Sequence, residues 1–185
     1  MLGRISLGLF LALALLQAGT HRAGAWTMED WNRCQGIAND SGLAPEARIA
    51  ACTQLIQTGQ LTPENLAIAY YDRGIDDSLD KLPDQAMADY TKAIAINPNY
   101  ADALYNRGDL YRNKGLYDQA IADYTKSIAI EPAYDVYLNR GICYEKKGMR
   151  NQAMADYQAS LNYAKPGSAG AQSAQQALQH LSASQ

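Results

Sequence analysis

The chain has 185 residues, of which 48% are hydrophobic and 19% charged, and its formal net charge is -3. These values are typical of a folded globular protein and argue against a disordered chain. Binding to nucleic acid depends largely on basic residues that neutralise phosphates. The balance of 16 basic against 19 acidic residues therefore argues against a nucleic-acid partner.

Residues 1–25 are predicted to be a secretory signal peptide. A basic residue, Arg4, is followed by an apolar run over residues 5–16 and by small residues at 23–25. The run is shorter than the roughly 20 residues of a membrane-spanning helix, and this order of segments is typical of a cleaved signal. We therefore expect export to the periplasm or outside the cell after cleavage near Ala25. The alternative is an uncleaved N-terminal helix that anchors the chain.

Cleavage would leave His180 as the only histidine, because His21 lies in the signal. Histidine is the commonest general acid or base near neutral pH and the commonest metal ligand. His180 lies in a tail of Gln, Ser and Ala, where an exposed side chain is expected. The sequence thus predicts no catalytic centre, no metal site and no cofactor, and an enzyme is only a remote alternative.

Residues 26–62 are predicted to form a degenerate helical hairpin. The segment 45–52 superposes on 83–90 of the repeat described next, so Cys52 stands where Tyr90 stands and Gly36 where Gly74 stands. The turn of this hairpin is then expected over residues 39–42. Cys34 and Cys52 flank the turn, and in an exported protein such a pair predicts a disulfide, the alternative being two small buried thiols.

An internal repeat occupies residues 63–166. The string Tyr-Asp-Arg-Gly at 71–74 recurs in related form at 105–108 and 138–141, and Gln-Ala-Met-Ala-Asp-Tyr at 85–90 recurs at 119–124 and 152–157, with steps of 34 and 33. Each unit contains two amphipathic helical stretches. We expect Gly on the first helix and Ala on the second to allow close packing, with Tyr filling the space beside them. The units are predicted at about 67–100, 101–133 and 134–166.

This pattern resembles the tetratricopeptide repeat family, whose unit is a helix-turn-helix of 34 residues. The resemblance implies an all-α, right-handed superhelical solenoid of stacked antiparallel helix pairs. Three departures stand out: Asp77 replaces the Tyr found at 111 and 144, Lys81 replaces the turn glycine, and one residue is missing between Pro132 and Gly141. We expect the missing residue to rotate the first helix of the third unit or to delay its start.

Residues 167–185 are predicted to form a capping helix and tail. Apolar residues recur on one stripe of this segment, which is expected to cover the exposed side of the last repeat; they are Ala174, Ala177, Leu178 and Leu181. Cys143 lies in a predicted first helix and has no histidine that could activate it. It is therefore expected to be a small core residue.

The acidic cluster over residues 76–80 does not fit a calcium loop, because its sixth position is Lys81 and its twelfth is Met87. A solvated helix end is expected instead, and the recurring carboxylates of the repeats are expected on the surface. No phosphate-binding loop, zinc ligand set or nucleophile motif is present in the sequence. We therefore expect no small-molecule substrate.

The remaining function is that of the repeat surface. In the tetratricopeptide family the first helices line a concave face that typically binds a peptide or partner segment, so the resemblance implies a protein or peptide partner. The alternative is a structural solenoid that self-assembles. The positions expected to contact the partner are Tyr71, Asp72 and Ile75 in the first repeat, Tyr105, Asn106, Asp109 and Arg112 in the second, and Leu138, Asn139, Ile142 and Lys146 in the third.

Some family members hold the C-terminal carboxylate of heat-shock chaperones in a clamp of Lys, Asn and Arg. Here Asn106 and Asn139 stand where such an Asn is found. Tyr71 and Tyr105, however, stand where the clamp has Lys, and Ile75 where it has Asn. This clamp is therefore not expected.

Overall fold

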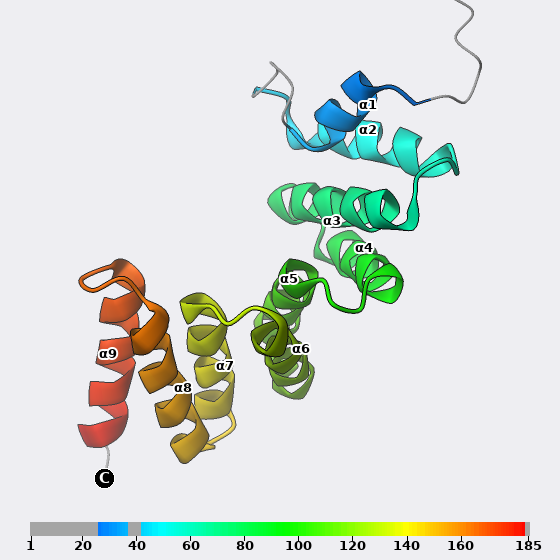
Figure 1. Cartoon of the computed structure of the whole chain (residues 1–185). Coiled ribbons are helices and arrows are strands. Elements are labelled where there is room, and N and C mark those ends of the chain that lie inside the picture. The colour runs from blue at the N-terminus through cyan, green and yellow to red at the C-terminus, as the bar shows by residue number, and fades with distance from the viewer. Residues whose placement is uncertain (1–25, 37–41, 184–185) are drawn as a thin grey trace, which may run out of the picture.

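The structure is a computed structural model that describes residues 26–36 and 42–183, and within these ranges all regular secondary structure is helical. Consecutive helices pack side by side, and the pairs stack into a curved row (Figure 1). The predicted all-α solenoid is confirmed, whereas the predicted signal peptide lies outside the described residues. The helices are α1 (Met28–Cys34), α2 (Pro45–Gln57), α3 (Pro63–Leu79), α4 (Pro83–Ile96), α5 (Ala101–Asn113), α6 (Tyr117–Ile130), α7 (Tyr134–Lys146), α8 (Arg150–Tyr163) and α9 (Ala169–Ala183).

The helix starts follow from local sequence. Proline is the first residue of α2, α3 and α4, a position where its missing N–H leaves no bond unmade. The Thr62 hydroxyl accepts a hydrogen bond from the Asn65 amide at 3.3 Å and caps α3. This start makes α3 17 residues long, against 13 for α5 and α7.

A glycine and a tyrosine form the central contact of each repeat, as predicted. Tyr124 of α6 is fully buried against α5, next to the buried Ala120. A Cβ atom placed on Gly108 would lie 2.8 Å from Cε1 of the Tyr124 ring, well inside van der Waals distance. The same contact joins Gly74 to Tyr90 and Gly141 to Tyr157.

Replacing Gly108 with Ala should therefore destabilise the protein by up to about 2 kcal/mol. Alanine favours a helix interior by about 1 kcal/mol over glycine, but overpacking typically costs about 1–3 kcal/mol. The Tyr124 ring cannot withdraw easily, because its hydroxyl donates a hydrogen bond to Asp109. Urea unfolding measures the loss. Gly42→Ala is the matched control, since a Cβ there would meet nothing within 4 Å; an equal loss in both variants would contradict the steric explanation.

Recurring carboxylates pair with arginines inside the solenoid, so the expectation that they lie on the surface was wrong. Arg107 of α5 donates from Nε and Nη2 to both oxygens of Asp123 of α6, at 2.7 and 2.8 Å. Its third nitrogen, Nη1, donates to the Thr91 hydroxyl of α4 at 3.3 Å. One guanidinium thus joins three helices from two consecutive repeats. The same arrangement recurs as Arg73 with Asp89 and Thr53, and as Arg140 with Asp156 and Thr125.

The turn between the two helices of a repeat keeps its geometry without glycine in the first repeat. Lys81 adopts a left-handed φ of 60°, close to the 73° of Gly115 in the second repeat. The amide of the following residue then donates back to the helix in both turns, from Leu82 to Asp77 at 2.7 Å and from Leu116 to Tyr111 at 2.9 Å. These bonds are those of the usual glycine-ended helix.

The missing residue of the third repeat lies in the linker before α7. Helices α5 and α7 both have 13 residues, and Gly108 and Gly141 occupy the same place in them. The prediction that α7 would be rotated or start late was therefore wrong. A linker absorbs a deletion readily, because it carries no packing face that must stay in register.

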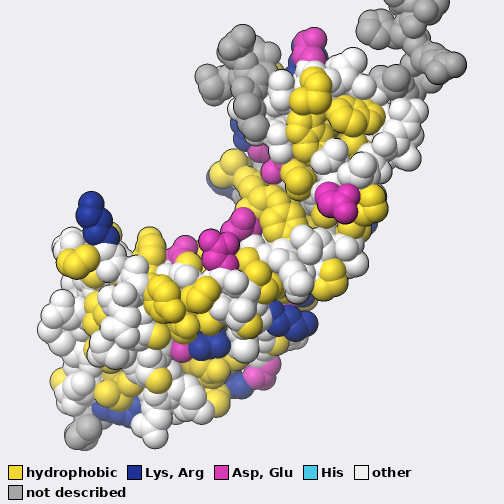
Figure 2. Space-filling view, viewed as in Figure 1, with side chains coloured by type: hydrophobic (Ala, Val, Ile, Leu, Met, Phe, Trp, Pro, Cys, Tyr) yellow, Lys and Arg dark blue, Asp and Glu magenta, His cyan; other side chains and the backbone are white. Residues whose placement is uncertain are grey.

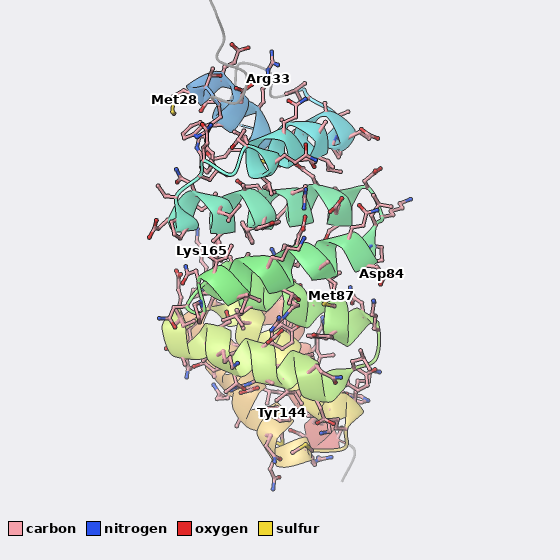
Figure 3. The ribbon with its side chains drawn as sticks, turned by 90° about the vertical axis from the view of Figure 1, so that its right-hand side faces the viewer. Met28, Arg33, Asp84, Met87, Tyr144 and Lys165 are labelled. Carbon is pink, nitrogen blue, oxygen red and sulfur yellow. A yellow bond between two sulfur atoms is a disulfide. The ribbon has the colours of Figure 1, made fainter. Side chains whose placement is uncertain are left out.

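The N-terminal hairpin consists of the short α1 packed on α2, and these helices lie above α3 in the stack (Figure 3). The predicted disulfide between Cys34 and Cys52 is present, and both residues are buried. Gly36, however, does not replace Gly74 within a helix, because α1 ends at Cys34 and Gly36 has a left-handed φ of 66°. Most of the predicted turn over residues 39–42 lies outside the described residues.

The acidic cluster at the end of α3 is not a solvated helix end. Asp76 and Asp77 are both buried, and the Asp76 carboxylate accepts hydrogen bonds from the Arg48 guanidinium of α2. Only Ser78 and Leu79 of the same stretch are exposed. The bonds between Asp76 and Arg48 couple the first repeat to the N-terminal hairpin.

The C-terminal helix α9 packs against α8 and α7. Its buried residues include Ala174 and Leu181, and Leu181 lies in a core cluster with Tyr157 of α8. Cys143 is buried with a free thiol, as expected for a core residue, and burial raises the pKa of that thiol to about 11. Within the described ranges, no helix is both long and apolar enough to cross a lipid bilayer.

Candidate functional site

The candidate residues lie on α3, α5 and α7, the first helices of consecutive repeats. Because the repeats align with steps of 34 and 33 residues, equivalent side chains form rows that cross these helices. One row contains Tyr71, Tyr105 and Leu138, and the next contains Asp72, Asn106 and Asn139. With the exception of the exposed Lys146, all the candidate residues are half-buried.

Hydrogen bonds join the two rows from one repeat to the next. Asn106 Nδ2 donates to the Tyr71 hydroxyl at 3.3 Å, and Asn139 Nδ2 donates to the Tyr105 hydroxyl at 3.2 Å. Burial raises the pKa of both tyrosines, so their hydroxyls stay protonated. The asparagines therefore fix the tyrosine rings in place, a role that the sequence did not indicate.

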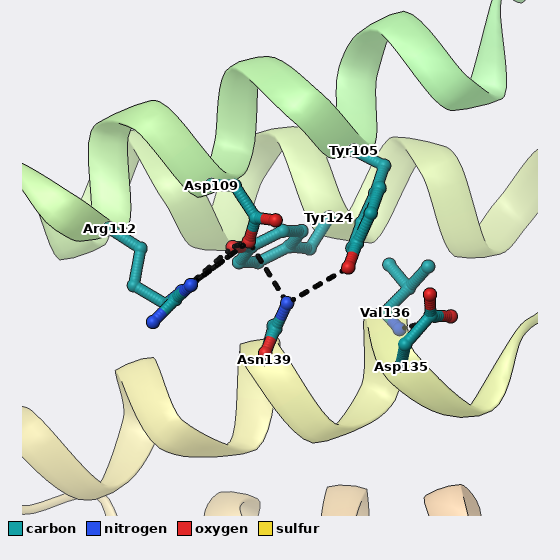
Figure 4. A network of polar contacts seen from close by, with 7 residues as sticks. All are labelled: Tyr105, Asp109, Arg112, Tyr124, Asp135, Val136 and Asn139. Atoms are coloured by element: carbon teal, nitrogen blue, oxygen red, sulfur yellow. Dashed lines mark hydrogen bonds and ion pairs between the residues drawn. The ribbon is translucent and has the colours of Figure 1, made fainter. Parts of the chain in front are cut away.

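Asp109 is the centre of a polar network between the second and third repeats (Figure 4). Its Oδ1 accepts a hydrogen bond from the Tyr124 hydroxyl at 2.5 Å and one from Asn139 Nδ2 at 2.9 Å. Arg112 lies 3.4 Å from the same oxygen and donates to the Tyr124 hydroxyl at 3.3 Å. Asp109 thus joins the second repeat to the third through Asn139, whereas the contacts of Arg112 stay within the second repeat.

A hollow of about 260 Å³ opens beside the rows of aromatic and amide side chains. It lies at the amino-terminal ends of α5 and α7, and its described lining includes three carboxylates and no basic side chain. Figure 2 shows acidic side chains gathered where this face of the molecule turns inward. The hollow is therefore an acidic site with aromatic walls. Its polar and aromatic lining residues are Tyr71, Asp102, Tyr105, Asn106, Ser127, Glu131 and Asp135.

A second, more apolar hollow of about 490 Å³ lies next to the start of α3 and the end of α4. Ile68 and Ile96 contribute to its walls, together with Tyr100 from the linker before α5. The Tyr100 ring packs on the Tyr71 ring with a centroid distance of 4.7 Å. This aromatic pair therefore connects the walls of the two hollows.

Asp72 carries an acceptor that the protein leaves unused. Its Oδ2 is buried and has no hydrogen-bond partner. Burial raises the pKa of the Asp72 carboxyl to about 6, partly opposed by a hydrogen bond from Gln35. The carboxylate is therefore charged at neutral pH and can accept a donor.

None of the four candidates of the third repeat lines the hollow, and Asn139 belongs instead to the Asp109 network. Leu138 and Ile142 pack against the core cluster that contains Leu181 of α9, so the C-terminal helix covers them. Lys146 is exposed at the last position of α7. Ile75 does not line either hollow. Tyr71, Tyr105 and Asn106 are thus the candidates that line the hollow, which is built mainly from α5 and the start of α7.

Tyr100, Glu131 and Asp135 are not among the residues predicted from the sequence to contact a partner. A signal was present for Asp135, because it lies 33 residues after Asp102 and both belong to the first turn of a first helix. Tyr100 and Glu131 lie in linkers, whose positions a helical period does not predict. Across the described parts of the chain, no group of three metal-binding side chains occurs.

Three models of the tetratricopeptide repeat match the sequence, over residues 84–115, 101–134 and 134–165. No curated protein sequence matches the chain. Two MamA structures are each 30% identical in sequence to this chain, with TM-scores of 0.61 and 0.62. Both alignments cover 70% of this chain, and they cover 70% and 75% of the respective MamA chains. The second repeat domain of human RPAP3, in complex with the HSP70 peptide SGPTIEEVD, is 25% identical with a TM-score of 0.59, over 65% of this chain and 98% of that domain.

Proposed function

The chain belongs to the tetratricopeptide repeat family, and from this membership we propose that it is a non-catalytic module that binds a segment of a partner protein on its concave face. Tyrosine and asparagine suit an extended segment, because rings give apolar contact and amides can bond its backbone. The observation that carries the proposal is the acidic hollow between α3, α5 and α7, with Tyr71 and Tyr105 in its walls.

The charge of the hollow indicates which segments fit it. The RPAP3 domain binds the HSP70 peptide SGPTIEEVD, which carries two Glu, one Asp and a terminal carboxylate. In this chain Asp102, Glu131 and Asp135 would repel such a peptide. The proposed partner segment is therefore neutral or basic and offers donors to these carboxylates.

We further propose that the protein acts in the periplasm or cell envelope. The disulfide between Cys34 and Cys52 supports this location, because disulfides form and persist in oxidising compartments. The apolar run of residues 5–16 also supports export, because it is preceded by a basic residue and followed by small residues, as in a cleaved secretory signal. A self-assembling solenoid has less support, since α9 covers Leu138 and Ile142 at the C-terminal end of the stack, where a further repeat would otherwise pack.

The variant Tyr105→Ala with Asn106→Ala tests the binding surface. It removes one wall of the hollow and the bond that orients Tyr71, and truncation of central aromatic contacts typically costs about 2 kcal/mol or more, or roughly thirtyfold in affinity. We expect crosslinking in the native envelope to recover partners at least about tenfold less efficiently with this variant.

The matched control is Gln119→Ala with Lys126→Ala, which removes two exposed side chains from α6 and should leave recovery unchanged. The peptide SGPTIEEVD should not compete for the recovered partners, whereas a basic segment of equal length should. If the double variant at 105 and 106 recovered every partner as well as the parent protein does, the assignment of the hollow would be wrong.

A further inference from the structure

Position 77 distinguishes the first repeat from the other two. The equivalent positions are Tyr111 and Tyr144, and each ring lies against the guanidinium of an arginine in the same repeat. The distance from the ring centroid to the arginine Cζ is 5.8 Å both for Tyr111 with Arg107 and for Tyr144 with Arg140. In the first repeat the residue is Asp77, whose side chain is much smaller than a tyrosine ring. The space that a ring fills in the later repeats is therefore open to another group here.

A cavity of about 250 Å³ lies at this place, between α2, α3 and α4. It is separate from the acidic hollow and shares no residue with it. Figure 3 shows these three helices following one another down the stack. The cavity combines carboxylate, hydroxyl and amide groups with an apolar wall, and its lining residues are Ile49, Thr53, Arg73, Asp77, Gln85, Ala88 and Asp89.

Asp77, which lines this cavity, carries an unpaired acceptor. The residue is only 2% exposed, and its Oδ1 has no hydrogen-bond partner. The nearest cation does not satisfy it, because Arg73 directs its donors to Asp89 and to the Thr53 hydroxyl. A buried carboxylate oxygen without a donor is costly, so this atom requires a donor that the chain itself does not supply.

We propose that this cavity binds a primary ammonium group on a short alkyl chain, with Asp77 as its counter-ion. The cavity holds two carboxylates and one guanidinium, and that guanidinium is committed to Asp89. One negative charge is thus left for a cation. Ile49 and Ala88 provide an apolar wall for the alkyl chain.

The geometry favours ammonium over other cations. A guanidinium binds best to two parallel oxygens, whereas Asp77 offers a single unpaired oxygen. An ammonium is a compact point charge with three donors, and the unpaired oxygen of Asp77 can accept one of them. The side-chain amide of Gln85 also lines the cavity, whereas the Thr53 hydroxyl is already bonded to Arg73 and to the Ile49 carbonyl. Divalent metal ions require more ligands, and among the described residues no cluster of three candidate ligands includes Asp77. The ammonium can belong to a lysine of a partner protein or to a free alkylamine.

The charge of Asp77 makes the proposed binding depend on pH. Burial raises the pKa of its carboxyl to about 6. Three neighbouring carboxylates raise this pKa further, namely Asp89 of α4 and the sequence neighbours Asp76 and Asp80, whereas Arg73 lowers it. No titratable residue of α2 lines the cavity. An alkylammonium stays protonated up to about pH 10, so binding should be full at pH 7.5 and weaken by about tenfold at pH 5, where Asp77 is mostly protonated.

Two-dimensional amide NMR of the full chain tests the proposal, with n-butylammonium chloride and Nα-acetyl-lysine methylamide as probes and n-butanol as the neutral control. We expect saturable shifts of the Thr53, Asp77 and Ala88 amides with a charged probe and none with n-butanol. Asp77→Asn should weaken binding at least about tenfold, because it removes a charge-assisted bond. Asp77→Tyr should abolish it by filling the cavity as Tyr111 and Tyr144 do.

The two probes distinguish the sources. Binding of the lysine derivative supports a partner side chain, and binding of n-butylammonium alone supports a free amine. The absence of saturable shifts with both probes, equal shifts with n-butanol, or unchanged affinity in Asp77→Asn would each overturn the proposal. Amide spectra of the variants show whether they fold. If Asp77→Tyr does not fold, Asp77→Asn still tests the proposal, because it keeps the shape of the residue. The outcome does not depend on whether the acidic hollow binds a partner.

Discussion

Replacing Asp123 with Ala should destabilise the protein by about 3–5 kcal/mol, the usual loss when one partner of a buried ion pair is removed. The Arg107 side chain is only 15% exposed, so it would lose both oxygens of Asp123 without gaining full contact with water. The effect should be visible as a lower urea midpoint and a lower free energy of unfolding.

An ion pair of similar composition on the surface provides the matched control. Asp118 of α6 pairs with Lys147, but its side chain is 78% exposed. Asp118→Ala should therefore change stability by no more than about 1 kcal/mol. Similar small losses in Asp118→Ala and Asp123→Ala would contradict a buried role for the Arg107 pair.

A double variant separates the ion pair from the fold that contains it. In Asp123→Ala with Arg107→Met the unpaired charge is gone, and the apolar chain of Met fills part of the space. Replacing a buried ion pair with apolar residues is often close to neutral, so the double variant should be more stable than Asp123→Ala alone. A loss equal to the sum of the two single losses would show that the residues do not act as a pair.

The sequence predicted the repeat and its core but missed this ion pair. Gly108 and Tyr124 were recognised because small and aromatic residues at a fixed period indicate a packed helix pair. Arg107 and Asp123 recur just as regularly, 16 residues apart as in the other two repeats. The recurring carboxylates are expected on the surface because charged residues are rarely buried, a rule that fails where the charges are paired.

The sequence predicted only some of the residues that line the hollow, and the reason is structural. Periodicity identifies the residues that share a helix face, but it does not identify the element that covers that face. Tyr105 and Asn106 lie at the hollow, since α5 has a neighbouring repeat on each side. Leu138 and Ile142 occupy related positions of α7, yet the neighbour there is α9, whose Leu181 packs into the same core cluster.

The disulfide prediction has its largest consequence in the N-terminal hairpin. The variant Cys34→Ala with Cys52→Ala should lose about 3 kcal/mol, the entropy-model value for a closed loop of this length. Helix α1 has only seven residues, whereas isolated helices shorter than roughly 12–15 residues are marginal in water. Without the bridge α1 is held mainly by its cap at Thr27 and by packing of Trp31 on the core.

The loss should be local, because each unit of a solenoid contacts only its neighbours. Amide hydrogen exchange in α1 and α2 should therefore rise more than in α5 to α8. Dithiothreitol should reproduce this pattern in the parent protein and have no effect on the double variant, in which the remaining thiol, Cys143, is buried and has no cysteine to pair with. A uniform rise along the chain would mean that the hairpin and the repeats unfold as one unit, and that Arg48 with Asp76 couples them more strongly than nearest-neighbour stacking alone predicts.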